Sequence, residues 1–360
     1  MSEVVYCCYV NSKLSGLLSR VSNMAQSTKD ITFLVFTDRQ VEFAPTNVIN
    51  VKVPRFINYL QILLLPIFIR HKLNQSRYDI VILRSLFPSP FYLMAFLFKQ
   101  FRLITEHHSF IISEYKALRQ FRNLIVSFLF YRPCMRLSDG FIFISEEVRR
   151  KYSHITQPST VIANGIYYDK EIQTGYRSFD GKSLDILFLA SRYAPWHGIE
   201  RLINSIDDWK LDYKANIHII GDIKKGEVNV VPNNTNVVFH GYLEKPEIMA
   251  ITSRCNFTAS TLQCHKISKE ASSLKTREYI LLNIPFIYSY EDTDIPGLQN
   301  FCIKLSDDDD LISWEAVRTF LHFVSTNKDE VIDAMQRYSL KVSYENKMEN
   351  LLEFAEEGLK

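Results

Sequence analysis

Short, almost continuously apolar runs recur along the chain, and most of the segments between them have helical periodicity. Seven such runs lie in the first half, at 4–10, 31–36, 48–53, 79–83, 102–106, 140–145 and 160–163. Six more lie in the second half, at 185–190, 216–221, 236–241, 256–260, 285–290 and 301–306. Runs that are apolar at consecutive positions predict parallel strands that are buried on both faces of a sheet.

The alternation of strands and helices predicts an α/β fold, with two Rossmann-like, doubly wound parallel-sheet domains facing across a cleft. The polar, strand-poor segment 165–183 marks the seam between them. We predict a first domain at 1–165, a second domain at 166–337, and a C-terminal helix at 338–360 that packs back toward the first. Ligands of such sheets bind at the carboxyl ends of the strands, so functional residues are expected just after the apolar runs.

Composition supports a globular protein of two domains. The chain has 360 residues, of which 47% are hydrophobic and 23% charged. Its six cysteines lack the CxxC spacing of metal and redox sites, which predicts reduced, mostly buried thiols. The N-terminus runs directly into a strand and does not resemble a signal peptide. The longest apolar run, 57–69, is shorter than the ~20 residues that cross a bilayer, so we expect a cytoplasmic protein without a spanning helix.

Charge is distributed unevenly between the two predicted domains. Counting Lys and Arg against Asp and Glu, residues 1–165 carry +10 and residues 166–360 carry −8. Much of the positive excess lies between 52 and 136, interleaved with Phe, Tyr and Leu. Such a surface suits anionic lipid headgroups, which would place the protein peripherally on the inner face of the cell membrane. The alternative is that these aromatic residues form an ordinary core. Nucleic acid is less favoured, because no recognition motif accompanies the charge.

The segment 269–290, KEASSLKTREYILLNIPFIYSY, carries the most specific candidate chemistry. A helix that begins near Ser273 would leave the amides of Leu274 and Lys275 free to receive an anion. Glu278, in the first two turns, could accept hydrogen bonds from a vicinal diol such as a ribose, and Glu270 lies on the preceding loop. The alternative reading is a solvated Lys/Glu helix face.

Three further candidates follow predicted strands. Gly16 opens the helix after the first strand, where a glycine permits close approach of a ligand to the backbone. His107 and His108 follow the strand 102–106, and a histidine there can bind substrate near neutral pH. Arg192 and His197 follow the strand 185–190 and suit a diphosphate. No Cys or Asp/His partner lies at metal spacing from these histidines, so no metal site is predicted.

Four segments of the second half resemble the retaining glycosyltransferases of family 4, which have the GT-B fold. The segments are LASRYAPWHGIERLINSI, IHIIGD, NVVFHGYLEKPEIMAI and EASSLKTREYILLNIPFIYS, in the order and spacing of that family. The last of them resembles the family's pair of glutamates separated by seven residues. The first half is similar more weakly, through Gly16, TEHHS, FIFISEEVRR and VIANGI.

The resemblance implies a role for each residue around the nucleotide of a donor. Arg192 would contact the diphosphate, and the amides of Leu274 and Lys275 would hold phosphate. Glu278 would bind the ribose. His197 stands where the family usually has a lysine, so the second cation of the site becomes a titratable group.

The resemblance also implies which residues meet the donor sugar. Glu270 would hold sugar hydroxyls near the anomeric carbon. His107 matches the family's first-domain histidine, with His108 as the second choice. Gly16 matches the second glycine of a loop pair whose first position is Ser15 here.

The expected function is transfer of a hexosyl group from a nucleoside-diphosphate sugar to an acceptor hydroxyl with retained configuration. The acceptor would be a glycan, polyprenyl-diphosphate-linked in the assembly of cell-surface polysaccharide, and no cofactor or metal ion would be required. A GT-B nucleotide-sugar epimerase and a non-catalytic nucleotide-sugar-binding protein are alternatives. An inverting transferase is a third, with Glu106, Glu114 or His108 as its general base.

Overall fold

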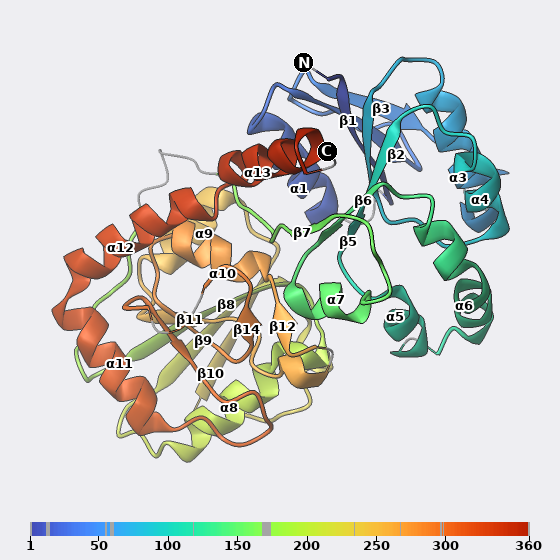
Figure 1. Cartoon of the computed structure of the whole chain (residues 1–360). Coiled ribbons are helices and arrows are strands. Elements are labelled where there is room, and N and C mark those ends of the chain that lie inside the picture. The colour runs from blue at the N-terminus through green and yellow to red at the C-terminus, as the bar shows by residue number, and fades with distance from the viewer. Residues whose placement is uncertain are drawn as a thin grey trace. The chain divides into compact units, whose positions relative to one another are not determined.

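The chain folds into two compact units in the computed structural model (Figure 1). The first comprises Met1–Ala163 with Tyr344–Lys360, and the second comprises Asn164–Ser343. The structure describes residues 2–11, 15–54, 56–57, 61–117, 119–167, 174–233, 235–266, 268–295, 297 and 299–358. The first continuous segment of this unit therefore ends two residues before the predicted domain boundary at 165. Its second segment begins at Tyr344.

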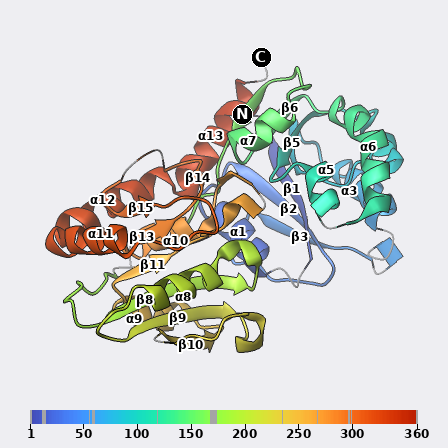
Figure 2. The ribbon, with the colours of Figure 1, turned by 90° about the horizontal axis from the view of Figure 1, so that it is seen from below.

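The first unit is built on a seven-stranded parallel sheet in the order β3-β2-β1-β4-β5-β6-β7 (Figure 2). All seven strands predicted for this half are confirmed. Their bounds are β1 Val4–Val10, β2 Ile31–Thr37, β3 Val48–Lys52, β4 Ile80–Arg84, β5 Arg102–His107, β6 Gly140–Phe143 and β7 Ser159–Val161.

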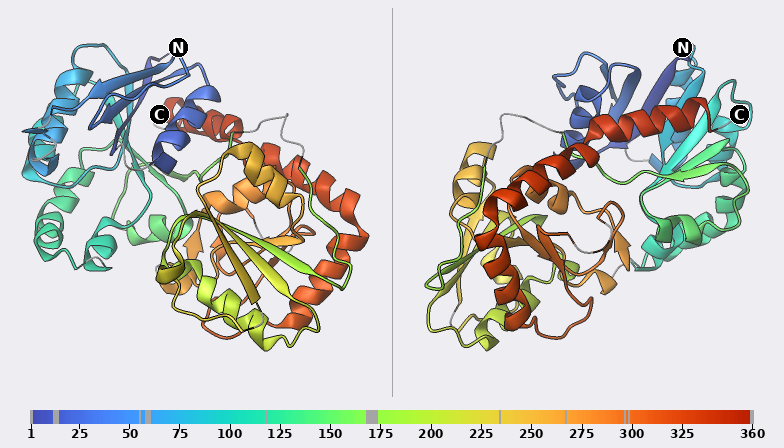
Figure 3. Two further views of the ribbon diagram at one scale, coloured as in Figure 1. Left: turned by 180° about the vertical axis from the view of Figure 1, so that it is seen from behind. Right: turned by 60° about the vertical axis from the view of Figure 1, so that its left-hand side comes forward.

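Helices connect these strands, and one comes from the far end of the chain. The C-terminal helix α13 contacts α1, so the two termini of the sequence contribute to one unit (Figures 1 and 3). Pro66 lies inside α3, and Pro90 begins α4, whose N-cap is the Ser89 side chain. The bounds are α1 Ser15–Gln26, α3 Gln61–Leu73, α4 Pro90–Phe96, α5 Ile111–Ala117, α6 Phe121–Met135, α7 Glu146–Lys151 and α13 Tyr344–Glu356.

The second unit has the same architecture, built on a six-stranded parallel sheet in the order β10-β9-β8-β11-β13-β15. Its six predicted strands are also confirmed: β8 Leu184–Arg192, β9 Ala215–Asp222, β10 Thr235–Gly241, β11 Phe257–Ala259, β13 Phe286–Tyr288 and β15 Cys302–Lys304. Its helices are α8 Ile199–Asp208, α9 Lys245–Thr252, α10 Leu274–Leu281, α11 Trp314–Thr326 and α12 Lys328–Lys341. Short 3₁₀ turns are η1 Pro195–His197, η2 Lys225–Glu227 and η3 Cys264–Lys266.

Two features differ from the sequence prediction. Glu270–Ala271 and Glu291–Asp292 form a separate two-stranded sheet, β12 and β14, which is too short to produce an apolar run. The C-terminal segment predicted as one helix is interrupted at Ser343, which is buried and bridges to Ile166. The interruption coincides with the boundary between the units.

The strand order places a topological switch in each sheet. The winding reverses between β1 and β4 in the first unit and between β8 and β11 in the second. Parallel sheets of this kind bind ligands outside the carboxyl ends of the strands at the switch. The segments after β1, β4, β8 and β11 are therefore the places to look for function. None of the described helices is both long and apolar enough to cross a membrane.

Gly221, near the end of β9, is required by its close contact with β8. Its φ is 127°, and a Cβ atom there would lie 1.7 Å from the carbonyl oxygen of Ala190. A side chain would therefore push the two strands apart. Because Gly221 has no side chain, β8 and β9 remain paired beyond an irregularity after Leu189, and Arg192 lies opposite Asp222.

Candidate functional site

The carboxyl end of β8 presents an arginine and then a tight turn. Arg192 is the last residue of the strand and is exposed. It has no hydrogen bond or ion pair with any residue that the structure describes. The chain then forms η1 and reaches Gly198, whose φ of 72° starts α8. A Cβ atom at Gly198 would lie 2.7 Å from the Cβ atom of Leu262, so η1 lies tightly against the segment that follows β11.

Helix α10 begins at Leu274 without a side-chain cap. Its N-cap residue is Ser273, and no side-chain hydrogen bond closes this end. The hydroxyl of Ser272 is engaged elsewhere, because it accepts a hydrogen bond from the amide of Asn164 at 2.8 Å. The first amides of a helix have no partner within the helix. Those of Leu274 and Lys275 are therefore oriented to receive an anion.

Arg277 fixes this end of the helix from inside the protein. Its side chain is fully buried and pairs with Asp292 and, at 2.7 Å, with Asp294. It also donates to the carbonyl oxygen of Ser273 at 3.2 Å. The arginine thus joins the N-cap of α10 to the strand β14. Of the two basic residues between the glutamates, Arg277 is structural.

Tyr279 holds α10 against the switch of the second sheet. Its hydroxyl donates to the carbonyl oxygen of Ala259, at the end of β11, over 3.0 Å. It also accepts a hydrogen bond from the amide of Leu189 in β8, over 3.3 Å. The start of α10 is in this way positioned relative to the ends of both strands.

Lys275, Phe188 and His197 form a cluster between α10, β8 and η1. The ammonium nitrogen of Lys275 lies 4.8 Å from the centroid of the Phe188 ring, and the ring centroids of His197 and Phe188 are 6.4 Å apart. The Nζ of Lys275 and the Nδ1 of His197 are both buried and have no hydrogen-bond partner among the described residues. Burial lowers the pKa of Lys275 to about 7, against the opposing charge of Glu278.

The His197 ring is neutral near neutral pH. Burial, with Lys275 and Arg192 nearby, lowers its pKa to about 3. The residue predicted as a titratable second cation is therefore uncharged in the ligand-free protein.

The two glutamates of the candidate motif lie on different elements. Glu278 is exposed in the second turn of α10, three residues after Lys275 and therefore on the same side of the helix. Glu270 is half-buried in β12, opposite Glu291 of β14. The structure thus gathers Arg192, His197 and the first turn of α10 in the second unit.

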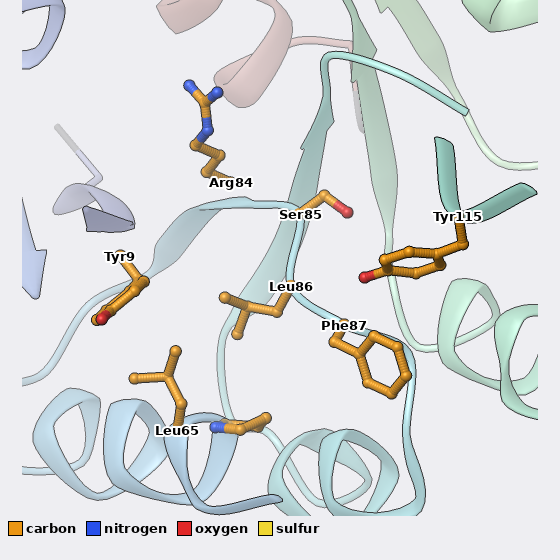
Figure 4. Close-up of a pocket in the computed structure, with 8 residues that line it drawn as sticks. Tyr9, Leu65, Arg84, Ser85, Leu86, Phe87 and Tyr115 are labelled. Carbon is orange, nitrogen blue, oxygen red and sulfur yellow. The ribbon is translucent and has the colours of Figure 1, made fainter. Parts of the chain in front are cut away.

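In the first unit, a pocket opens where β1 and β4 end. It has a volume of about 260 Å³. Figure 4 shows Tyr9 from β1, Leu65 from α3, Arg84 at the end of β4, residues 85–87 after it, and Tyr115 from α5 around the pocket. The rings of Phe87 and Tyr115 meet edge to face, with centroids 5.7 Å apart. An adjoining hollow of about 230 Å³ shares this wall and adds Glu106 and His108.

A buried network of charges lies behind this wall. Glu106 accepts a hydrogen bond from Arg20 of α1 at 2.8 Å and another from the hydroxyl of Tyr6. Burial alone would raise the pKa of Glu106, but His108, Arg20 and Arg84 hold it well below its usual range. The Nη1 of Arg84 is buried and has no hydrogen-bond partner among the described residues.

The adjacent histidines point to opposite faces of the sheet. His107 is 2% exposed and packs against the rings of Phe141, Phe143 and Tyr152. Its Nδ1 lies 2.9 Å from the Tyr152 hydroxyl, and burial lowers its pKa to about 3. His108 is instead part of the hollow's wall, with Nε2 3.1 Å from Glu106. The geometry favours His108, the second choice from the sequence, for contact with a ligand.

Two predicted residues lie partly outside the described structure. Gly16 is the second residue of α1, but residues 12–14 before it and its own surroundings are outside the described part. Glu114 lies in α5, and its side chain is outside as well. Among the residues that the structure describes, no group of three or more His, Cys, Asp and Glu could hold a metal ion.

Sequence analysis missed the side chains of Lys275 and Arg84. In the sequence both are ordinary charged residues. What marks them is a buried nitrogen that has no hydrogen-bond partner among the residues described by the structure. That signal requires the fold, because the aromatic and charged groups around them come from distant parts of the chain.

A similarity to one protein family lies in the first half of the chain. Residues 21–170 match the sequence profile of Glycosyltransferase Family 4. No curated protein matches the chain significantly.

Solved structures share the architecture over nearly the whole chain. The lipopolysaccharide outer core galactosyltransferase WaaB is 13% identical with a TM-score of 0.62, and the match covers 97% of this chain and 99% of that one. Sucrose-phosphate synthase from Thermosynechococcus elongatus is 13% identical with a TM-score of 0.65, covering 98% of each chain. Anabaena HepE in complex with UDP-glucose is 12% identical with a TM-score of 0.62, covering 98% and 99%. At these identities the likeness shows the fold alone. The chain therefore has the GT-B fold of these proteins, and its segment 21–170 is similar to Glycosyltransferase Family 4.

Proposed function

We propose that the protein transfers a hexosyl group from a nucleoside-diphosphate sugar to an acceptor hydroxyl with retention of configuration. The observation that carries the proposal lies at the switch point of the second sheet. There the start of α10 has no side-chain cap, and Arg192 nearby is not paired with any described residue. Amides and cations converging on one point suit a diphosphate. The complex of HepE with UDP-glucose, a protein of the same fold, supports a nucleotide sugar as the donor.

The chemistry assigned to the second unit is stabilisation of the leaving group. As the bond between the anomeric carbon and the diphosphate breaks, negative charge develops on the phosphate oxygens. Arg192 and the amides of Leu274 and Lys275 would stabilise that charge. The acceptor oxygen bonds to the anomeric carbon on the same face, and its proton passes to the departing diphosphate. Glu278 would hold the ribose and Glu270 the sugar hydroxyls. This scheme needs no metal ion.

The acceptor is assigned to the pocket of the first unit. Its aromatic rings offer flat apolar faces, on which a sugar ring can stack, and Ser85 and Arg84 offer donors. We assign the contact with the donor sugar, which the sequence assigned first to His107, to His108, because the ring of His107 is enclosed by the core. A glycan acceptor linked to polyprenyl diphosphate, in cell-surface polysaccharide assembly, remains the preferred class.

The proposal is tested by incubating the protein with UDP-, GDP-, ADP- and dTDP-hexoses and following release of the nucleoside diphosphate. We expect one nucleotide sugar to be consumed. A Glu278→Ala variant should need a donor concentration about ten- to a hundredfold higher, because a hydrogen bond to a charged group contributes about 1.5–3 kcal/mol. Glu278→Gln, which keeps one acceptor oxygen, should lose less. Tight donor binding without turnover, across a range of acceptors, would favour a non-catalytic binding protein.

We further propose that the first unit contacts anionic lipid through α4 and α6. Large apolar side chains stand exposed along α6, where Phe128 is 73% exposed. Met94 of α4 is also exposed, as are Leu97 and Phe98, which follow that helix. On α6 the exposed apolar residues recur at helical spacing on one face: Phe121, Ile125, Phe128 and Leu129. Arg122, Arg132 and Arg136 are exposed nearby. Apolar residues flanked by arginine are typical of helices that lie on a charged bilayer surface.

Vesicle sedimentation tests this surface. The protein should co-sediment with vesicles of phosphatidylglycerol and phosphatidylcholine at low salt, and less at high salt because the charges are screened. Replacing both Phe121 and Phe128 by Ser should weaken binding about tenfold or more, since each phenylalanine loses apolar burial. Phe323→Ser, at an exposed site on α11, is the matched control. If the double variant co-sediments with the vesicles as well as the wild type and Phe323→Ser do, the proposal is contradicted.

A further inference from the structure

Two buried nitrogens lie together beside the proposed diphosphate site, and neither has a hydrogen-bond partner in the described part of the chain. They are the Nζ of Lys275 and the Nδ1 of His197, both packed around the ring of Phe188. A buried polar group without a hydrogen bond is costly, and a buried charge more so. The two groups also interact electrostatically, because the charges of Lys275 and Arg192 both disfavour a positive charge on His197. A structural role does not account for this arrangement.

Other polar groups in the second unit show the contrast. Arg277 is fully buried and pairs with two aspartates. Arg201 is 4% exposed and pairs with Asp308, while it also donates to the carbonyl oxygen of Leu262 at 2.6 Å. Both of these cations are matched by acceptors within the protein. The ammonium of Lys275 lies over an aromatic ring and near the charge of Glu278, but it donates no hydrogen bond to any residue that the structure describes.

We infer that the ammonium group of Lys275, and not His197, supplies the second positive charge for the donor diphosphate beside Arg192. The inference rests on the proposed function, and it assigns the lysine side chain a contact with the ligand in addition to its backbone amide. An entering diphosphate would give Lys275 the acceptor that it lacks. The neutral ring of His197 would contribute a hydrogen bond without charge.

Three features place the ammonium correctly for this task. Lys275 is the second residue of α10, so its side chain starts where the free amides are. The Phe188 ring, in the middle of β8, holds the nitrogen near His197, whose ring also feels the charge of Arg192 at the end of that strand. Hydrogen bonds of Tyr279 to β8 and β11 keep α10 in this register. The low pKa of the lysine, about 7, follows from burial and is relieved when an anion binds.

Binding of inorganic pyrophosphate, measured by calorimetry at pH 6.5, tests the inference. UDP, GDP, ADP and dTDP, each beside its nucleoside, serve as further probes. Lys275→Met should bind pyrophosphate and the preferred nucleoside diphosphate about ten- to a hundredfold more weakly, while binding of the nucleoside stays unchanged. Lys275→Arg should keep most of the affinity. Lys214→Met, at an exposed site of the same unit, is the control.

Two further readouts separate a ligand contact from a structural role. Thermal unfolding of ligand-free Lys275→Met should occur at the wild-type temperature or above, because an unpaired buried charge has been removed. Adding His197→Lys to Lys275→Met should restore part of the lost affinity, since a cation returns to the same cluster.

The outcomes are distinguishable. If the wild type binds a nucleoside diphosphate and Lys275→Met binds it equally well, the inference is overturned and the proposed function stands. A Lys275→Met protein that melts well below the wild type and binds normally when folded would assign the lysine to stability instead. If the wild type binds neither pyrophosphate nor any nucleotide, the proposed function fails and the inference fails with it.

Discussion

Replacing Arg277 by Met is expected to destabilise the second unit by about 3–5 kcal/mol, because it breaks a fully buried ion pair and leaves a charge without its partner. The side chains of Arg277 and Asp292 are both 0% exposed. Asp292 would remain in the interior with its charge unmatched, and Asp294 would lose a hydrogen bond of 2.7 Å. For a unit of this size, the thermal midpoint should fall by about 6–20 °C.

An exposed pair provides the matched control. Arg318 and Glu315 lie three residues apart on α11 and are 57% and 70% exposed. Arg318→Met should change stability by no more than about 1 kcal/mol. Thermal unfolding followed by circular dichroism measures both variants. If Arg277→Met melts within a degree or two of Arg318→Met, the buried pair does not hold the start of α10.

Replacing Arg192 by Met is expected to reduce the turnover rate by about a hundred- to a thousandfold. The arginine is unpaired among the described residues, so its charge is available to the diphosphate. Stabilisation of charge that develops in the transition state contributes about 2.7–4 kcal/mol per donor. The effect should therefore appear mainly in kcat, with a smaller change in the affinity for the donor.

Initial rates with the nucleotide sugar that the wild type consumes measure this effect. Arg192→Lys should retain part of the rate, because it keeps the charge and loses the planar two-pronged contact. Arg254→Met, another exposed arginine of the second unit, should have the wild-type rate. A rate for Arg192→Met within threefold of the wild type would remove the arginine from the site.

The apolar runs predicted the strands of both large sheets, because a parallel strand that is buried on both faces has no polar positions. The same argument explains the omission of β12 and β14. Each has two residues, Glu270–Ala271 and Glu291–Asp292, and only hydrogen bonding with the other makes it a strand. Sequence periodicity carries no signal at that length.

The two histidines show a limit of a different kind. If the alternation of β5 is continued by one residue past its last residue, His107 and His108 are expected on opposite faces of the sheet. Both faces of this sheet are covered, so the sequence does not say which residue reaches a pocket. The structure decides it through Phe141, Phe143 and Tyr152, which enclose His107.

The basic residues of the motif show why side-chain roles need the fold. In sequence, Lys275 and Arg277 are equivalent members of a charged helix turn. In the structure Arg277 reaches Asp292, fifteen residues later, and Lys275 reaches Phe188 of β8. Local composition predicted a solvated face or an anion site, and long-range packing distinguishes the two residues.

The central claim is most directly tested by proton NMR of the reaction itself. The protein is incubated with the nucleotide sugar that it consumes, and the anomeric proton of the first product is compared with that of the donor. The account predicts that the nucleoside diphosphate is released and that the transferred hexose keeps the anomeric configuration of the donor. An inverted product would contradict the same-face mechanism, and a failure to consume any nucleotide sugar with any acceptor would contradict the proposed function.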